Sequence, residues 1–289
     1  MSTKQFYLWR RKIRRWTSRL TLVAIALSGC CYLYGSQIEP NWIEVVEIEL
    51  TIPSLERTFD NFKIVQISDL HLTKFMPEKR LNRIIKLVNR QQPDAIAITG
   101  DIITRRNSFD PKQLQFKLSQ LRAKTATLSV LGNHDHWQRK IDLLKQVLAD
   151  SKITNLDNQV YTIERGSDEL VFAGLDDPYW GSPDLPKIMA QLPDNDTAIL
   201  LVHEPDYINQ SAKTHRFALQ LSGHSHGGQI RIPFVEPPIL PQGAKKYYAG
   251  LSRVEDTITY TNRGLGMTGL PYRFGSRPEI TVFTLHSAS

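Results

Sequence analysis

The segment from Leu219 to Gly228 constrains this 289-residue chain most, because an apolar run ends there in a turn with two histidines. His224 and His226 are one residue apart, and in extended chain residues i and i+2 point to the same side, so both rings can address one point. The flanking glycines let the backbone bend and allow a close approach. Taken alone, this pattern also fits a surface turn with two solvated histidines.

The chain from residue 62 to residue 150 repeats an apolar strand, a polar turn and an amphipathic helix. Three runs, rich in β-branched or small apolar residues, predict strands at 64–68, 95–99 and 126–131. Apolar residues at helical spacing predict helices at 81–88, 114–121 and 141–148. Strands that alternate with helices indicate a largely parallel, buried sheet.

The second half of the chain predicts a different arrangement, with few helices between strands. The predicted strands lie at 170–174, 198–202, 217–221, 229–232, 257–261 and 279–285. They indicate a second, mixed sheet packed against the first. Upstream, residues 37–61 read as a linker and an edge strand, in which a phase slip at Val45 and Val46 predicts a bulge.

The N-terminal 36 residues differ in composition from the body. Residues 1–19 form a basic leader with seven Lys or Arg residues and no acid, and without these seven the chain has 29 basic and 29 acidic residues. The net charge of +7 therefore belongs to the leader, and we expect no nucleic-acid binding. The only two cysteines, Cys30 and Cys31, also lie outside the body, which excludes a disulfide framework and a thiol nucleophile there.

Residues 20–36 predict a signal anchor or a signal peptide. The 15 residues from 20 to 34 carry no charge, and the flanking aromatic residues Trp16 and Tyr34 suit a tight membrane span. Cleavage after export and lipidation at Cys30, in a segment that resembles a bacterial lipobox, remain alternatives. In each case the positive-inside rule places the N-terminus in the cytoplasm and the body on the other side.

Potential metal ligands follow five of the predicted strands. They are Asp69 with His71, Asp101, Asn133, His203, and His224 with His226. Each has an ordinary alternative, such as a turn cap for Asp101, an Asx-turn for Asn133 or a satisfied core histidine for His203. Polar residues at the carboxyl ends of parallel strands converge on one edge, however, and this donor set suits two divalent ions of the Mn, Fe, Co or Zn kind.

At these residues the chain resembles the calcineurin-like metallophosphoesterases, whose blocks are D-x-H, G-D, G-N-H-[DE], a lone H and G-H-x-H. The blocks stand here as Asp69-Leu70-His71, Gly100-Asp101, Gly132-Asn133-His134-Asp135, His203 and Gly223-His224-Ser225-His226. The surrounding segments are similar to a membrane-anchored bacterial branch that resembles UDP-2,3-diacylglucosamine pyrophosphatases. They include Gly174-Leu175-Asp176-Asp177-Pro178 and Arg277-Pro278-Glu279-Ile280.

The resemblance implies a metallophosphoesterase domain over residues 62–289, with a four-layer α-β-β-α sandwich of two mixed sheets and a dinuclear metal site. It places one metal on Asp69, His71 and His226, the other on Asn133, His203 and His224, and Asp101 between them. Mn, Fe or Zn would fit, and Mn is favoured. A shared hydroxide would attack phosphorus. His134 would protonate the leaving oxygen or hold a phosphoryl oxygen, and Asp135 would orient its ring.

The expected activity is hydrolysis of a phosphodiester or pyrophosphate bond, on a membrane lipid, a lipid precursor or another phosphorylated small molecule. The alternatives are a nucleotide or cyclic-nucleotide phosphodiesterase, a broad phosphomonoesterase and a catalytically silent metal-binding scaffold. Asp176 and Asp177 are read as a turn before Pro178 or as support for a ligand. Three arginines of the C-terminal segment, Arg263, Arg273 and Arg277, are read as candidates to bind an anionic substrate or as ordinary surface arginines. The sequence predicts no oligomeric state.

Overall fold

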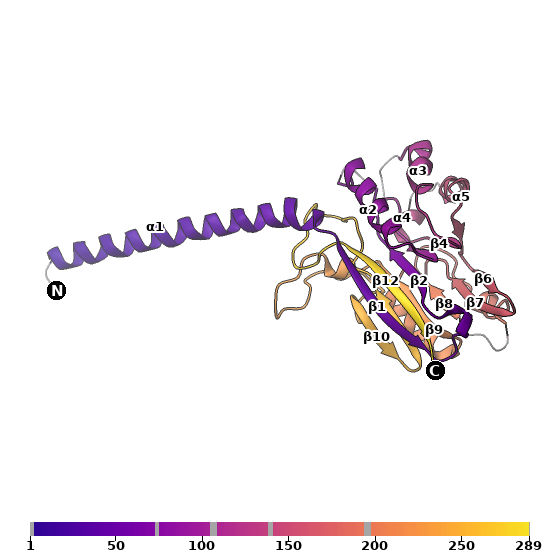
Figure 1. Ribbon diagram of the computed structural model, residues 1–289. Coiled ribbons are helices and arrows are strands. Elements are labelled where there is room, and N and C mark those ends of the chain that lie inside the picture. The colour runs from indigo at the N-terminus through magenta and orange to yellow at the C-terminus, as the bar shows by residue number, and fades with distance from the viewer. Residues whose placement is uncertain (1–2, 73–74, 105–108, 138–140, 194–197, 289) are drawn as a thin grey trace.

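The computed structural model describes residues 3–72, 75–104, 109–137, 141–193 and 198–288. The first two residues of the basic leader therefore lie outside the described part. Two six-stranded sheets form the centre of the domain, and one long helix, α1 (Thr3–Leu33), extends away from it (Figure 1).

The first sheet has the strand order β1-β12-β2-β3-β4-β5. Its strands are β1 (Glu44–Ile52), β12 (Glu279–Ser287), β2 (Phe62–Ile67), β3 (Ala95–Thr99), β4 (Ala126–Val130) and β5 (Thr154–Asn155). As predicted, β2, β3 and β4 are parallel neighbours, and β12 returns antiparallel to β2. Helices cover one face and the second sheet the other, which explains why these strands are apolar on both faces.

The predicted bulge at Val45 and Val46 is wrong. Strand β1 pairs with β12 in unbroken parallel register, from Glu44 opposite Glu279 to Ile52 opposite Ser287. Both valines are half-buried although they point to opposite faces. Both faces of the sheet are partly covered at this edge, so an apolar residue can lie on either face. The break in the alternation is therefore accommodated without a bulge.

The second sheet has the order β10-β11-β9-β8-β7-β6. Its strands are β10 (Gly250–Val254), β11 (Thr257–Thr261), β9 (Phe217–Ser222), β8 (Ala198–Leu201), β7 (Asp168–Gly174) and β6 (Gln159–Arg165). The central four are parallel, and β10 and β6 are antiparallel edges. The predicted strand at 229–232 is wrong: a single bridge joins Ile230 to Phe274, and Gln229 has a positive φ of 50°, which interrupts extended chain.

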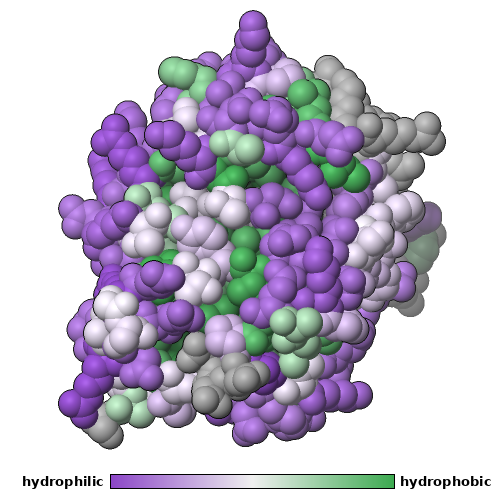
Figure 2. All heavy atoms as spheres, turned by 90° about the vertical axis from the view of Figure 1, so that its right-hand side faces the viewer, coloured by the Kyte–Doolittle hydropathy of each residue, from purple (hydrophilic) through white to green (hydrophobic). Residues whose placement is uncertain are grey.

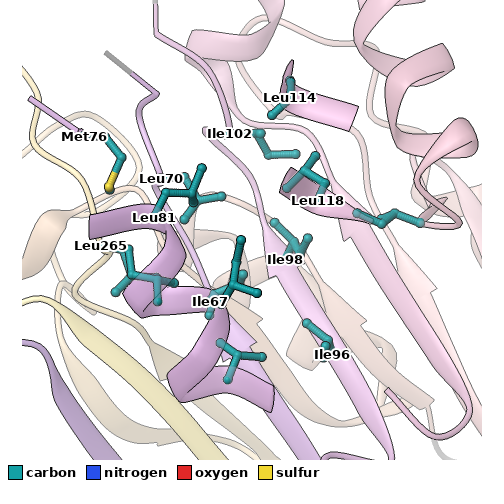
Figure 3. Close-up of a cluster of buried hydrophobic side chains, with 14 of the residues drawn as sticks. Ile67, Leu70, Met76, Leu81, Ile96, Ile98, Ile102, Leu114, Leu118 and Leu265 are labelled. Carbon is teal, nitrogen blue, oxygen red and sulfur yellow. The ribbon is translucent and has the colours of Figure 1, made fainter. Parts of the chain in front are cut away.

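Helices complete the predicted four layers. Those along the first sheet are α2 (Glu78–Arg90), α3 (Pro111–Leu118) and α5 (Ile141–Asp150), and those along the second are α6 (Leu185–Met189) and α7 (Ile208–Ser211). One apolar cluster packs α2 and α3 onto β2 and β3, as Figure 3 shows for Leu81, Leu118, Ile67 and Ile98. A second cluster fills the space between the sheets, and a third lies under α6.

Helix α1 is long and apolar enough to cross a membrane, within a candidate span of Gln5–Asn41. Its described side chains are exposed along nearly the whole length, and in Figure 1 it leaves the domain without packing along it. A helix that exposes apolar side chains in this way fits a single-pass membrane anchor. The chain continues directly into a π-helical turn (Tyr34–Ile38) and a 3-10 turn (Glu39–Asn41).

Candidate metal centre

The loops after β2, β3, β4, β8 and β9 meet at one end of the two packed sheets. Each begins where a buried strand ends, so the backbone that holds the site is anchored on both sheets. The structure brings together all seven predicted ligands there: Asp69, His71, Asp101, Asn133, His203, His224 and His226. All seven are buried.

Asp69, His71 and His226 form the first donor group, in which one atom of each lies within 4.8 Å of the others. The Nε2 atoms of the two histidines are 3.0 Å apart, and Asp69 Oδ1 is 3.4 Å from His226 Nε2 and 3.9 Å from His71 Nε2. Both Asp69 oxygens also accept the His224 amide, at 3.2 and 3.0 Å. The three ligand atoms therefore face a common point.

Asp101, His203 and His224 form the second donor group. Asp101 Oδ2 lies 3.3 Å from His203 Nε2 and 3.4 Å from His71 Nε2. One carboxylate oxygen thus faces both groups. This is the position that a bridging ligand needs.

Main-chain and hydroxyl oxygens orient the imidazole rings. His203 Nδ1 is 2.7 Å from Thr99 O, and His224 Nε2 is 2.8 Å from Gln242 O. A carbonyl can only accept, so each of these nitrogens carries the proton, which leaves His203 Nε2 and His224 Nδ1 to bind metal. His71 Nδ1 contacts Thr104 Oγ1 at 2.9 Å. Sequence reasoning missed Thr104 and Gln242, and no motif marks either residue.

Burial keeps three of the histidines neutral. It lowers the pKa of His71 to about 3 and that of His224 to about 4, and it holds the pKa of His226 well below its usual range. Burial opposes ionisation of Asp101 as well, but neighbouring His203 and His134 keep its pKa well below the ordinary value. These three neutral imidazoles and the ionised Asp101 carboxylate match the protonation states that a divalent cation requires. Burial favours neutral His203 as well, but Asp101 outweighs it and raises the pKa of His203 well above its usual range, so this ring would release a proton on binding metal.

Five of the ligands adopt left-handed backbone conformations. The φ angles are 50° at Asp69, 44° at His71, 54° at Asp101, 72° at His224 and 52° at His226. This region costs free energy for residues with a Cβ, and such residues concentrate at functional sites. The packing around the ligands is also tight, because a Cβ on Gly132 would lie 2.4 Å from Asp101 Oδ1.

The donor set fits a pair of divalent cations. Asn133 Oδ1 is buried without a hydrogen-bond partner among the residues that the structure describes, and an unpaired buried polar atom is costly. Imidazole, carboxylate and amide donors suit Mn, Fe, Co or Zn. The geometry and the donor chemistry therefore fit the predicted ligands.

His134 lies at the edge of the donor groups and lines a pocket of about 350 Å³. Its ring stands edge-on to His71, with centroids 4.7 Å apart, and lies 4.5 Å from the Trp137 ring. The pocket continues between apolar side chains that include Ile230, Ile239 and Leu270. A phosphoester in this pocket would approach His134 and the ligands from the same side.

The contacts of Asp135 differ from the expected role of orienting the His134 ring. Its two oxygens accept the amides of Ile103 (2.9 Å), Gly132 (3.0 Å) and Ile102 (3.3 Å). These bonds join the loops after β3 and β4, which carry Asp101 and His134. Asp135 thus positions His134 through the main chain, while its role in catalysis stays a prediction.

Other candidates from the sequence make structural contacts. Asp177 accepts the amides of Tyr179 and Trp180, as the reading of a turn predicts, while Asp176 accepts the Ser182 amide and contacts His136. The three candidate arginines are all engaged within the protein. Arg263 pairs with Glu279 and Glu44, Arg277 pairs with Glu44, and Arg273 is fully buried among carbonyl groups.

Comparison with known proteins decides the family. The calcineurin-like phosphoesterase profile matches residues 62–228, which contain the complete ligand set. The chain belongs to this family. It is therefore a metallophosphoesterase, and the fold described above is the one that the sequence motifs predicted.

Similar metallophosphoesterases match over nearly their full length. The chain is 40% identical to YkuE of Bacillus subtilis, over 93% of this chain and 94% of that protein. It is 31% identical to the phosphodiesterase YaeI of Escherichia coli, with 94% and 98% covered. It is 25% identical to the UDP-2,3-diacylglucosamine pyrophosphatase LpxG of Chlamydia trachomatis, with 92% and 96% covered.

Proposed function

We propose that this chain hydrolyses a phosphodiester or pyrophosphate bond in a membrane lipid or lipid precursor. The observation that carries the proposal is the pocket beside the donor groups. One wall holds His134 with Asp101, His224 and His226, which come from both groups, and another wall contains Ile230, Ile239 and Leu270. A polar reacting centre beside an apolar wall suits a phosphorylated molecule with an acyl chain. The names of YaeI and LpxG agree with these two reaction types.

Different residues would bind the metal ions and transfer the proton. Asp69, His71 and His226 would hold one cation, Asn133, His203 and His224 the other, and Asp101 both. Divalent ions held there would supply activation of a water nucleophile and neutralisation of charge on the phosphoryl oxygens. His134 gives a proton to the departing oxygen from the pocket side.

Hydrolysis of bis-p-nitrophenyl phosphate with added Mn²⁺ tests the chemistry, and Asp101→Ala is the matched inactive control. Fractionated membrane lipids then test the substrate, with release of a phosphorylated head group as the readout. Turnover of nucleotide esters without any lipid product would favour a nucleotide phosphodiesterase instead. Metal binding without turnover of any ester would indicate a scaffold.

We also propose that the domain lies on the non-cytoplasmic side of the membrane. Basic residues of α1 precede the uncharged stretch, among them Arg14, Arg15 and Arg19, and such residues stay in the cytoplasm. Protease added to spheroplasts should therefore digest the domain and leave a cytoplasmic control protein intact. Digestion only after the membrane is broken would contradict this orientation.

A further inference from the structure

The end of α1 is packed against the domain, on residues 270–276, which we call the docking loop. The Tyr272 hydroxyl donates to Cys31 O at 2.8 Å, and the Arg273 amide donates to Gly35 O at 2.9 Å. A Cβ on Gly35 would lie 2.2 Å from the Tyr272 ring, so the two segments are in direct contact. The direction in which the anchor leaves is therefore set by this loop.

A buried carboxylate completes the attachment. Glu39, which is 1% exposed, accepts the amides of Gly275 (2.9 Å) and Ser276 (2.5 Å). Hydrogen bonds to an ionised acceptor are among the stronger ones in proteins. The Ser276 hydroxyl in turn donates to His226 O at 2.7 Å, so the docking loop connects the anchor to a metal ligand.

The opposite edge of the docking loop pairs with residues 229–231. The Phe274 amide donates to Gln229 O at 3.0 Å, and the Arg231 amide donates to Phe274 O at 2.6 Å. On the anchor side, the Tyr34 ring packs edge-on against the Phe274 ring at 5.9 Å. The docking loop thus lies between the end of the anchor and residues 229–231. Neighbouring hydrogen-bonded segments are about 5 Å apart, so residues 229–231 lie about 10 Å from the end of the anchor.

From residue 231 the chain enters a segment that exposes apolar side chains, residues 232–239, which we call the apolar loop. Its large apolar residues and their exposed fractions are Ile232 (54%), Phe234 (108%), Val235 (60%) and Ile239 (78%). Phe234 stands at the tip of a turn with φ of 66°, a position that usually takes Gly or Asn. Nothing in the described part of the domain covers this aromatic ring.

The apolar loop lies on the side of the domain from which α1 leaves, within the segment that links β9 to β10 (Figure 1). The side turned away from α1 is mainly hydrophilic (Figure 2). The uncharged stretch of the anchor ends at Tyr34, and Tyr residues mark the membrane–water interface. The membrane surface therefore lies close to the level of the docking loop and of the apolar loop beside it.

We propose that the apolar loop inserts into the membrane that α1 crosses, and that the active-site pocket opens at the lipid surface. Ile239 belongs both to the loop and to the pocket wall, together with neighbouring Pro238, so a lipid could pass from the bilayer into the pocket along apolar side chains. Two charged residues suit the head-group layer: Arg231 precedes the loop and lies over the Tyr248 ring, and Glu236 lies within the loop and is exposed. The insertion depends on the anchor alone, whereas the lipid route rests on the proposed function.

Insertion is tested with the full chain in phosphatidylcholine–phosphatidylglycerol vesicles. In a Cys30→Ser, Cys31→Ser background, a cysteine introduced by Pro233→Cys carries an NBD dye and leaves Phe234 in place. The matched control is Phe116→Cys, whose exposed position (63%) lies on α3. We expect a blue-shifted NBD emission at 233 that doxyl-labelled lipids quench, and neither effect at 116.

Two outcomes would overturn the insertion. The first is equal quenching at the two positions. The second is a blue shift at 233 that persists in detergent without lipid quenching, because a second copy or another protein segment would then cover the loop. Neither readout involves catalysis, so the insertion is judged separately from the proposed function.

The lipid route is tested with the double variant Phe234→Ser, Val235→Ser, whose positions lie outside the pocket wall. Loss of two inserted side chains should raise KM for a vesicle-borne phospholipid diester at least about tenfold. The rate on soluble bis-p-nitrophenyl phosphate should not change. Equal losses on both substrates, or no loss on the lipid, would overturn the route, whereas failure of the parent chain on every phosphoester would refute the proposed function.

Discussion

The amide N–H of His134 donates to Asp101 Oδ1 at 2.8 Å. This bond fixes one oxygen of the carboxylate, while the other lies between His71 and His203 at 3.4 and 3.3 Å. His134, which we expect to transfer a proton, is therefore hydrogen-bonded through its main chain to Asp101, which we expect to bridge the two cations. Changes at either position should be separable, because Asp101 supplies a ligand atom and the His134 backbone bond survives replacement of its ring.

Asp101→Ala should lose most of the bound metal, because a bridging ligand serves both cations. Asp176→Ala is the matched control, since Asp176 is also a buried loop carboxylate but contacts Ser182 and His136 instead of the ligands. Elemental analysis of the purified proteins, with circular dichroism as a check on folding, measures the difference. Two metals retained by Asp101→Ala would falsify the bridging assignment.

His134→Gln should keep about two metals per chain, because His134 is the site histidine to which we assign no cation. Its rate on a diester with an alkoxide leaving group should fall roughly 10²–10⁴-fold, the usual contribution of a positioned proton donor. The fall on p-nitrophenyl esters should be smaller, because p-nitrophenolate departs without protonation. Steady-state rates on the two substrate types give the comparison.

Three other results for His134→Gln would change the assignment. Loss of metal would make His134 a ligand, as its place beside His71 and Asp101 permits. Equal losses on both ester types would indicate that the ring stabilises charge in the transition state. Near-full activity on both would remove His134 from the mechanism.

The sequence predicted which residues meet at the candidate metal site, because these residues follow strands whose burial is visible locally. Asp69 and Asp101 end runs that are apolar on both faces, and parallel neighbours must bring such ends together. Gly132 in the motif also indicates the site, because its lack of a Cβ allows the backbone to approach Asp101 closely. Local pattern and tertiary structure agree at these points.

The contacts that orient the site were not predictable, because they depend on segments distant in the chain. Gln242 acts through its carbonyl oxygen, so its side chain gives no signal. Glu39 lies in a stretch that reads as a linker, yet its carboxylate is buried against residues more than 230 positions away. Gln229, whose φ of 50° interrupts the predicted strand at 229–232, accepts the amide of Phe274, which is likewise distant in the chain.

Glu39→Ala should weaken the attachment of the anchor. The change leaves the amides of Gly275 and Ser276 buried without an acceptor, at a cost of about 1–3 kcal/mol for each amide. We expect faster proteolysis between α1 and β1 in detergent, and a lower urea midpoint for the domain. Glu164→Ala, at an exposed position of β6, is the control; unchanged proteolysis of Glu39→Ala would show that the docking contacts contribute little.

The contact between His136 and Asp176 should make stability depend on pH. Their Nε2 and Oδ1 atoms are 2.8 Å apart. Burial by itself would lower the pKa of His136, but the bond to Asp176 outweighs it and raises that pKa above 6.5. Burial opposes ionisation of Asp176, yet the bond to His136 and the Ser182 amide lower its pKa below 3.8.

A raised histidine pKa stabilises the fold fully below 6.5, and the contribution is lost as the pH rises through the folded value. The lowered carboxyl pKa acts in the opposite direction, and its contribution is lost only as the pH falls below 3.8. His136→Gln should therefore reduce the free energy of unfolding by about 1 kcal/mol near pH 5.5, after allowance for solvent screening, and by progressively less in alkaline buffer. Urea titrations across this range measure the difference, and His215→Gln, at an exposed histidine, should show little change. If His136→Gln reduced the free energy of unfolding by the same amount from pH 5.5 into alkaline buffer, the pair would act through packing and not through charge.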